Sequence, residues 1–318
     1  MDTDSRGFTG EQLKAAIYTK RDSGKGLELI DTDTPNPKQG EVLIKTLAAS
    51  VNPLDWRMKA RRPGVDIAGE VVSLGGGVTR FHRGDAVFGA GKGSFAEYVC
   101  ARESKLAAKP DNISFEEAAC VPIAGLTALQ GLRDKGKLAP GEKVLINGAA
   151  GGVGTFAVQI AKAFGAGVTG VCSTKNLEMV RSLGADLLVD YAQQDFTHET
   201  RCYDLLLDNV GNRTLSAFRR VLTPRGRCVL AGAPKNAGLG TLLLRVLQAT
   251  AWSCFLRQTF VFFIARMKSQ DLESLCTLMR SGSIRPIIDR RYSLSNTAEA
   301  IAYVEEGHAR AKVIITPD

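Results

Sequence analysis

One stretch of the sequence decides the fold: Val144-Leu145-Ile146-Asn147-Gly148-Ala149-Ala150-Gly151-Gly152-Val153-Gly154-Thr155. Its apolar start predicts a strand, its glycines predict a tight turn, and the residues that follow, 156–163, predict a helix. Ala149, Gly151 and Gly154 occupy the three positions of a dinucleotide-binding fingerprint, with alanine replacing the first glycine. Small residues are needed there because the backbone must approach a pyrophosphate and the helix must direct its N-terminal N–H groups at the anion. Similar turns also join strands to helices that bind nothing, so the turn alone leaves a purely structural role open.

The composition is that of a globular protein with two domains. The chain has 318 residues, of which 44% are hydrophobic and 23% charged, and this length exceeds what one small core usually organises. The net charge of +8 comes from dispersed basic residues, and no aromatic-rich nucleic-acid module accompanies them. Nucleic-acid binding is therefore not expected, and a groove that attracts an anionic cofactor explains the excess equally well.

The cysteines and the termini favour a cytoplasmic protein. Seven cysteines are scattered along the chain without a Cys-x-x-Cys pair, which indicates reduced thiols. The polar N-terminus has no apolar signal core. The apolar region over residues 239–264 is interrupted by polar and charged residues, so no run reaches the ~20 residues of a membrane helix. We expect no membrane span.

Composition along the chain predicts four segments. Residues 1–12 are expected to form a flexible tail, and residues 13–122 read as short strands separated by Pro/Gly turns. Residues 123–255 alternate strands with helices, which predicts a doubly wound parallel sheet. Residues 256–318 are expected to return and complete the first domain.

The residues after the second predicted strand favour NADPH. Enzymes that prefer NAD place an acid roughly 20 residues past the glycine turn, where it accepts a hydrogen bond from the ribose 2′-hydroxyl. Here that region holds Ser173 and Lys175, and no acid occurs until Glu178. A serine can donate to a 2′-phosphate and a lysine can neutralise it. A solvent-exposed lysine at a helix start is the alternative explanation of Lys175.

Further motifs point to one superfamily. They are Ala49-Ser50-Val51-Asn52-Pro53-Leu54-Asp55, Arg83-Gly84-Asp85-Ala86-Val87-Phe88-Gly89, Ser182-Leu183-Gly184-Ala185-Asp186, Asp208-Asn209-Val210-Gly211 and Gly307-His308-Ala309-Arg310-Ala311-Lys312. Together with the glycine turn, they resemble the medium-chain dehydrogenase/reductase superfamily over nearly the whole chain. The sequence is most similar to its zinc-independent quinone oxidoreductase branch, the zeta-crystallin-like proteins.

This resemblance implies an α/β fold, with a GroES-like, partly open β-barrel domain, a Rossmann domain, and NADPH in the cleft between them. Ala150, Gly151, Gly152 and Val153 would contact the pyrophosphate, and Ser173, Lys175 and Tyr191 would surround the 2′-phosphate. Asn209 would contact the adenosine side or the ribose. The nicotinamide end would meet Thr127, Gly232, Ala233, Phe262 and Phe263, and Lys312 would close the cleft. Tyr191 and the two phenylalanines could equally be core aromatics.

The zinc ligands of the related alcohol dehydrogenases are missing. Asn52 stands at the position of the ligating cysteine, and Gly64-Val65-Asp66 replaces Gly-His-Glu. Zinc requires nitrogen or sulfur ligands close together, so we expect no metal. Asn52 is then the candidate hydrogen-bond donor to the substrate, although an Asn before a proline also suits a turn. Asp55 could orient a neighbouring group or cap a short helix at residues 56–59.

Without a Lewis acid, hydride transfer suits an acceptor that is already electron-poor, such as a quinone or an α,β-unsaturated carbonyl. An enzyme that reduces such acceptors with NADPH is therefore predicted. The alternative is an NADPH-binding regulatory or accessory protein, possibly one that binds nucleic acid, with little turnover. The segment 60–63 is shorter than in relatives, which implies a more open pocket with Arg61 or Arg62 at its rim. Relatives often dimerise through the nucleotide domain, so a homodimer is expected.

Overall fold

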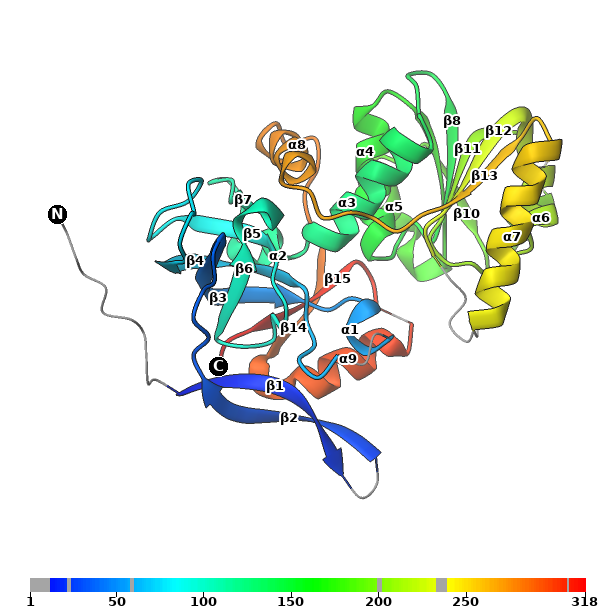
Figure 1. Ribbon diagram of the computed structural model, residues 1–318. Helices are drawn as coiled ribbons and strands as arrows, with labels where there is room; N and C mark the ends of the chain where they lie inside the picture. The colour runs from blue at the N-terminus through cyan, green and yellow to red at the C-terminus, as the bar shows by residue number, and fades with distance from the viewer. Residues whose placement is uncertain (1–11, 22–23, 58–59, 199–201, 233–238, 308) are drawn as a thin grey trace. The chain divides into compact units, whose positions relative to one another are not determined.

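The computed structural model describes residues 12–21, 24–57, 60–198, 202–232, 239–307 and 309–318. These residues form two compact units, which Figure 1 shows as ribbons. The first unit extends to Ile123 and also includes Met267–Arg280 and Pro286–Asp318. The second comprises Ala124–Arg266 and Ser281–Arg285.

A parallel sheet forms the centre of the second unit. Its strand order is β10-β9-β8-β11-β12-β13, and every neighbouring pair is parallel. The order reverses between β8 and β11, which makes that point the topological switch of a Rossmann-type sheet, where ligands bind. The predicted doubly wound sheet is therefore confirmed. The strands are β8 (Lys143–Asn147), β9 (Gly167–Cys172), β10 (Leu187–Asp190), β11 (Tyr203–Asp208), β12 (Leu222–Leu230) and β13 (Thr259–Phe262).

Helices cover both faces of this sheet, so its central strands are apolar on both sides. In Figure 1, α4 and α5 lie on one face and α6 and α7 on the other. Buried Phe218 and Phe260 pack with Leu145 and Leu230 in the core between the sheet and its helices. The helical segments of this part of the chain are α3 (Pro122–Gln130), the π-helical η2 (Gly131–Lys135), α4 (Gly152–Ala163), η3 (Thr174–Asn176), α5 (Leu177–Ser182), η4 (Phe196–His198), α6 (Leu215–Arg220) and α7 (Leu239–Phe255).

The first unit is built on a curved, mostly antiparallel sheet in the order β14-β15-β3-β4-β5-β7, with β6 also paired to β3. Because β15 pairs with the end of β3, through Ile314 opposite Ser50, the C-terminal residues complete this sheet. A separate hairpin joins β1 and β2. The strands are β1 (Gln12–Arg21), β2 (Gly24–Asp33), β3 (Glu41–Ser50), β4 (Asp66–Leu74), β5 (Ala86–Ala90), β6 (Tyr98–Arg102), β7 (Leu106–Ala108), β14 (Ile288–Ser293) and β15 (Lys312–Thr316).

Short helices surround the sheet of the first unit. A capping box starts α2, because the Ser114 side chain accepts from the backbone N–H of Glu117 while the Glu117 side chain accepts from the backbone N–H of Ser114. The helices are α1 (Leu54–Arg57), η1 (Glu103–Lys105), α2 (Phe115–Ala119), α8 (Ser269–Arg280), η5 (Leu294–Asn296) and α9 (Thr297–Glu305).

Two details differ from the sequence expectations. The chain stays in the second unit up to Arg266, beyond the expected boundary at residue 255, because β13 adds to β12 as the sixth strand. The apolar stretch from residue 239 forms the 17-residue helix α7, which the composition did not predict as a helix. None of the described helices is both long and apolar enough to cross a membrane. The tail expected over residues 1–12 lies outside the described residues, except for Gln12 at the start of β1.

Candidate functional site

The glycine turn between β8 and α4 has the geometry that close approach to a ligand requires. Gly148 has a φ of +78°, which favours glycine because it lacks a Cβ atom. A Cβ on Gly154 would lie 2.1 Å from the carbonyl oxygen of Gly148, so only glycine fits there. Gly151 caps α4 in an extended conformation.

The N-terminus of α4 supplies hydrogen-bond donors at this turn. The first N–H groups of a helix have no partner within the helix, and its dipole favours an anion there. Gly151, Gly152 and Val153 are half-buried and Ala150 is buried, so the backbone there forms a close-packed turn. This end of α4 follows β8, at the point where the strand order reverses and ligands bind. Its position and its N-terminal N–H groups therefore fit the pyrophosphate of a dinucleotide.

Asn209, directly after β11, carries the clearest sign of a ligand. Its backbone N–H donates to the carbonyl oxygen of Asn147 at 3.2 Å, but the side-chain Oδ1 and Nδ2 are buried without a hydrogen-bond partner among the described residues. Leaving such atoms unpaired costs about 1–3 kcal/mol per group, which the hydroxyl groups of a bound nucleotide would offset. Gly232 packs directly against the backbone of Asn209, because a Cβ on Gly232 would lie 2.1 Å from the carbonyl carbon of Asn209.

The loop that carries Asn209 is held by an ion pair. Arg245 of α7 donates from Nη1 to the carbonyl oxygen of Gly211 at 3.1 Å and from Nη2 to Oδ2 of Asp208 at 3.3 Å. The other oxygen of Asp208 accepts from the amide of Asn147 at 2.8 Å. Burial raises the pKa of Asp208 above its usual value, and hydrogen bonds from Gly211 and Asn147 oppose the rise. Asp208 and Arg245 thus fix the chain at the ends of β8 and β11.

The proposed 2′-phosphate residues lie at the ends of β9 and β10. Ser173 follows β9, and its Oγ accepts from the side chain of Asn176 at 3.1 Å. Lys175 is exposed in η3, and Tyr191, 54% exposed, donates its backbone N–H to the carbonyl oxygen of Cys172 at 3.1 Å. That hydrogen bond ties the two strand ends together, and Tyr191 is not a core aromatic.

A carboxylate also lies near this edge, which the sequence reasoning did not consider. Asp190 accepts hydrogen bonds from the hydroxyl of Thr174 at 2.5 Å and from the backbone N–H of Ala192 at 2.9 Å. The hydrogen bond from Thr174 is the main reason that the pKa of Asp190 lies below its usual value. Asp190 therefore serves to bind η3 to β10.

The residues predicted for the nicotinamide end have different environments. Thr127 is half-buried on α3, and Phe262 is 36% exposed at the end of β13. Phe263 is buried, and its ring packs against Gly131, where a Cβ would lie 3.3 Å from the ring. Phe263 is therefore a core aromatic. Ala233 lies outside the described residues.

Lys312 belongs to the first unit, where it forms a buried polar cluster with Asn52 and Asp66. Its ammonium donates to Oδ1 of Asn52 at 2.6 Å and to the carbonyl oxygen of Val51 at 3.1 Å, and lies 3.5 Å from Oδ2 of Asp66. Ser50 and Ile123 also donate to Asp66, at 2.9 and 3.0 Å. The cluster thereby joins the ends of β3, β4 and β15.

Asn52 is fully engaged within this cluster. Its Nδ2 donates both to Oδ2 of Asp66 at 2.8 Å and to the carbonyl oxygen of Ser50 at 3.3 Å, while its Oδ1 accepts from Lys312. An amide has two N–H donors, so neither is left for a substrate in this arrangement. This geometry gives Asn52 a positioning role.

Asp55 lies within α1 and does not cap a helix. Its Oδ2 accepts from the backbone N–H of Asn52 at 2.7 Å and its Oδ1 from that of Gly64 at 3.2 Å. Burial is the main cause that raises the pKa of Asp55 to about 7. The carboxyl therefore holds together the two chain segments in which the related alcohol dehydrogenases have zinc ligands, at Asn52 and next to Gly64.

The position that holds zinc in the related alcohol dehydrogenases does not fit a metal here. Burial raises the pKa of Asp66, and the Lys312 ammonium is the strongest opposing influence. The carboxylate is occupied by donors, and the neighbouring Val65 has no ligating atom. Within the described part of the chain, no group of three or more His, Cys, Asp or Glu side chains is placed to hold a metal ion. The Asp66–Lys312 pair escaped sequence reasoning, because 246 residues separate its members.

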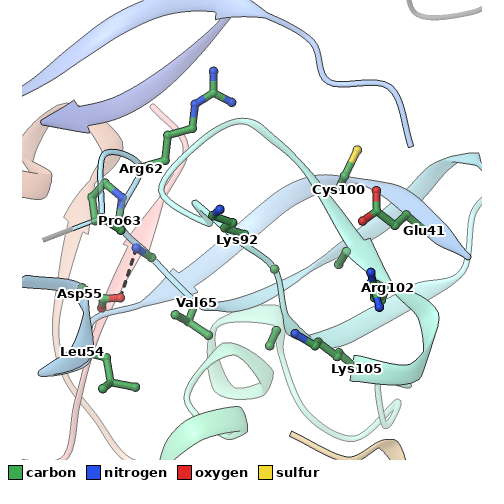
Figure 2. Close-up of a pocket in the computed structure, with 15 residues that line it drawn as sticks. Glu41, Leu54, Asp55, Arg62, Pro63, Val65, Lys92, Cys100, Arg102 and Lys105 are labelled. Atoms are coloured by element: carbon green, nitrogen blue, oxygen red, sulfur yellow. Dashed lines mark hydrogen bonds between the residues drawn. The ribbon is translucent and has the colours of Figure 1, made fainter. Parts of the chain in front are cut away.

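A pocket of ≈ 410 Å³ opens beside Asp55 in the first unit. Figure 2 shows Leu54, Asp55 and Val65 near one another, with Lys92 and Lys105 among the other lining residues. Arg62 and Pro63, from the shortened segment 60–63, also line it. The expectation of a more open substrate pocket with Arg61 or Arg62 at its rim stays a prediction, and of these two arginines Arg62 lines the pocket.

Two family models match the chain. An alcohol dehydrogenase GroES-like domain matches residues 38–111, and a zinc-binding dehydrogenase model matches residues 183–315. The α/β fold with a GroES-like first domain is therefore confirmed.

Curated relatives and solved structures agree with these models. The chloroplast envelope quinone oxidoreductase homolog of Arabidopsis thaliana is 32% identical, over 98% of this chain and 100% of that protein. A chloroplastic NADPH-dependent alkenal/one oxidoreductase of Arabidopsis thaliana is 31% identical, over 96% of this chain and 80% of that protein. The structure of the quinone oxidoreductase from Coxiella burnetii superposes with a TM-score of 0.84 at 29% identity, covering 97% of this chain and 100% of that chain.

Proposed function

The chain belongs to the medium-chain dehydrogenase/reductase superfamily, in its quinone oxidoreductase branch, and from this premise we propose that it reduces quinones or α,β-unsaturated carbonyls with NADPH and without zinc. It is an oxidoreductase with a nicotinamide cofactor. The alternative of an NADPH-binding protein with little turnover is not favoured, because the relatives are named for their reductase activity.

The observation that carries the proposal is the polar cluster around Asp66. The Lys312 ammonium and the Asn52 amide both donate to the Asp66 carboxylate. Hydrogen-bond donors therefore stand where the related alcohol dehydrogenases have zinc ligands. An alcohol or a simple aldehyde would need the Lewis acid that such a site cannot hold. A quinone or an enone places the incoming charge on its own oxygen and mainly needs orientation.

The preference for NADPH rests on the ends of β9 and β10. Ser173 and the exposed Lys175 can bind a 2′-phosphate, while Asp190 is occupied by Thr174 and Ala192. The reduced nicotinamide, when bound, supplies the hydride to the electron-poor carbon of the acceptor. The glycine turn and Asn209 position the cofactor, and Thr127, Gly232, Ala233 and Phe262 are proposed for its nicotinamide end. Asn52 and Asp55 act as positioning residues, through their hydrogen bonds to Lys312 and Gly64.

The protein is also proposed to be a cytoplasmic homodimer. All seven cysteines are free thiols, which suits a reducing compartment, although the two relatives named above are chloroplast proteins.

Helix α7 exposes Leu243, Leu244 and Leu247, by 61%, 69% and 57%. An apolar face of this kind suits a contact with a second copy, and analytical ultracentrifugation of the wild type and of Leu244→Glu would test it. A wild type that sediments as a monomer would remove the homodimer.

A panel of quinones, enones and alcohols tests the function. We expect oxidation of NADPH with a quinone or an enone, at a rate that EDTA does not change, and slower oxidation of NADH. Oxidation of alcohols that depends on added zinc would overturn the proposal. Tight NADPH binding with no turnover of any acceptor would favour the binding-protein alternative.

A further inference from the structure

The pocket in the first unit concentrates positive charge. Four cationic side chains line it, and all four residues are exposed. They come from separate elements: the segment 60–63, the loop after β5, the last residue of β6, and η1. Figure 2 labels all four among the residues that line the pocket: Arg62, Lys92, Arg102 and Lys105.

Among the described residues, the side chains of three of these cations have no hydrogen-bond or ion-pair partner. Lys92, Arg102 and Lys105 form no side-chain hydrogen bond or ion pair with any residue that the structure describes, whereas Arg62 donates to the hydroxyl of Thr32 at 2.9 Å. Other exposed arginines of this unit do find carboxylates, as in the pair of Arg80 with Glu273 at 2.7 Å. The positive charge of the pocket is therefore not neutralised by ion pairs.

The acidic residues of the pocket do not cancel this charge. Glu41 and Asp55 are the two carboxyl groups in its lining. Glu41 accepts from the backbone N–H of Lys38 at 3.1 Å, and Asp55 is buried with its oxygens occupied by Asn52 and Gly64. The lining thus holds four cationic and two carboxyl side chains, so positive charge is in excess. Such a concave, cationic surface attracts anions.

The remaining wall of the pocket is apolar. Leu54, Pro63, Val65 and Ala90 contribute hydrocarbon surface. Gly91 also lines the pocket, and a Cβ on it would lie 2.6 Å from Cγ1 of Val99. Two surfaces therefore meet in one cavity, an apolar one beside Asp55 and a cationic one formed by Lys92, Arg102 and Lys105. A ligand that matches both has a hydrocarbon body and one anionic end.

We propose that this pocket selects acceptors with a carboxylate remote from their reactive double bond. The proposal rests on the proposed function, because it specifies the substrate class of that reaction. The carboxylate would contact Lys92 and Lys105, and the hydrocarbon chain would lie against Leu54 and Val65.

Matched acceptors test this selectivity. One is a linear enone with a terminal carboxylate, and the other is the methyl ester of the same compound. At low salt, we expect the wild type to prefer the carboxylate by about tenfold in kcat/KM, because several exposed ion pairs contribute together. In Lys92→Met/Lys105→Met the preference falls toward one, because kcat/KM for the carboxylate falls more than kcat/KM for the ester. Lys14→Met/Lys45→Met removes two exposed lysines of the same unit outside the pocket and should keep the preference.

The outcomes separate the two proposals. Equal kcat/KM for both acceptors in the wild type, or a preference that survives in Lys92→Met/Lys105→Met, overturns the selectivity. Absence of NADPH oxidation with either acceptor overturns the proposed function. In that case, calorimetric titration of the same proteins with the carboxylate compound still decides the inference. Saturable binding that Lys92→Met/Lys105→Met weakens supports the pocket, and absence of binding contradicts it.

Discussion

Replacing Lys312 with methionine should destabilise the first unit strongly. The methionine keeps the apolar stem but removes the ammonium, so Asp66 loses its only ion-pair partner among the described residues and remains buried. Breaking a buried pair by removing one member costs about 3–5 kcal/mol, because an uncompensated charge is left in the interior. We expect Lys312→Met to lower the free energy of unfolding by this amount.

The double variant Asp66→Asn/Lys312→Met is the control. It removes both charges, and the amide oxygen introduced in place of the carboxylate can still accept from the backbone N–H of Ile123, as Oδ1 of Asp66 does at 3.0 Å. Asn52 can turn its amide to accept from the new amide N–H, since Lys312 no longer occupies Oδ1. The double variant should therefore recover most of the loss, with a coupling free energy of about 2 kcal/mol or more.

Urea denaturation followed by tryptophan fluorescence measures these free energies. Trp56 lies in the first unit and Trp252 in the second, so a Trp252→Phe background restricts the signal to the unit that carries the change. A loss below about 1 kcal/mol in Lys312→Met, or a double variant that loses the sum of both single changes, would refute the reasoning that the pair is a coupled, buried ion pair.

Three further predictions concern Asp55 and the cofactor site. The pKa of Asp55 is raised from 3.8 to about 7, so the folded state holds a proton that the unfolded state releases. The stability that this group contributes is therefore fully present below pH 3.8 and is lost as the pH rises from 3.8 to about 7. Over this range the free energy of unfolding of the wild type should fall by about 1.4 kcal/mol per pH unit relative to that of Asp55→Asn. A pH-independent difference in urea denaturation would contradict this. Lys175→Ala should weaken NADPH binding by about 10- to 100-fold and leave NADH binding unchanged in fluorescence titrations, and equal losses would remove Lys175 from the phosphate site. Gly154→Ala should abolish NADPH binding, because its Cβ would lie 2.1 Å from the carbonyl oxygen of Gly148, whereas Gly151→Ala meets the same oxygen at 3.5 Å and should retain it; similar titrations for both variants would refute the assignment.

The fold could be predicted where local chemistry determines it. The strand, glycine turn and helix of residues 143–163 are adjacent in sequence, and their spacing predicted β8 and α4 directly. Helix α7 was missed because its exposed leucines blur the apolar periodicity, while tertiary contacts with β13 stabilise the helix.

The candidate site could be predicted only in part. The sequence named Asn52 and Lys312 separately, as a donor and as a residue that closes the cleft, but their hydrogen bond joins positions 260 residues apart. Such a pairing depends on β15 returning to β3, and no local pattern encodes it. The unpaired amide of Asn209 likewise becomes visible only when burial is known.

The most direct test of the account follows the hydride itself. An enone is reduced with NADPH that carries deuterium at nicotinamide C4, in the presence of EDTA, and the product is examined by NMR. Zinc-free reduction of an activated acceptor predicts one deuterium on the β-carbon of a saturated ketone. Deuterium on the carbonyl carbon of an allylic alcohol, formed only when zinc is supplied, would contradict it.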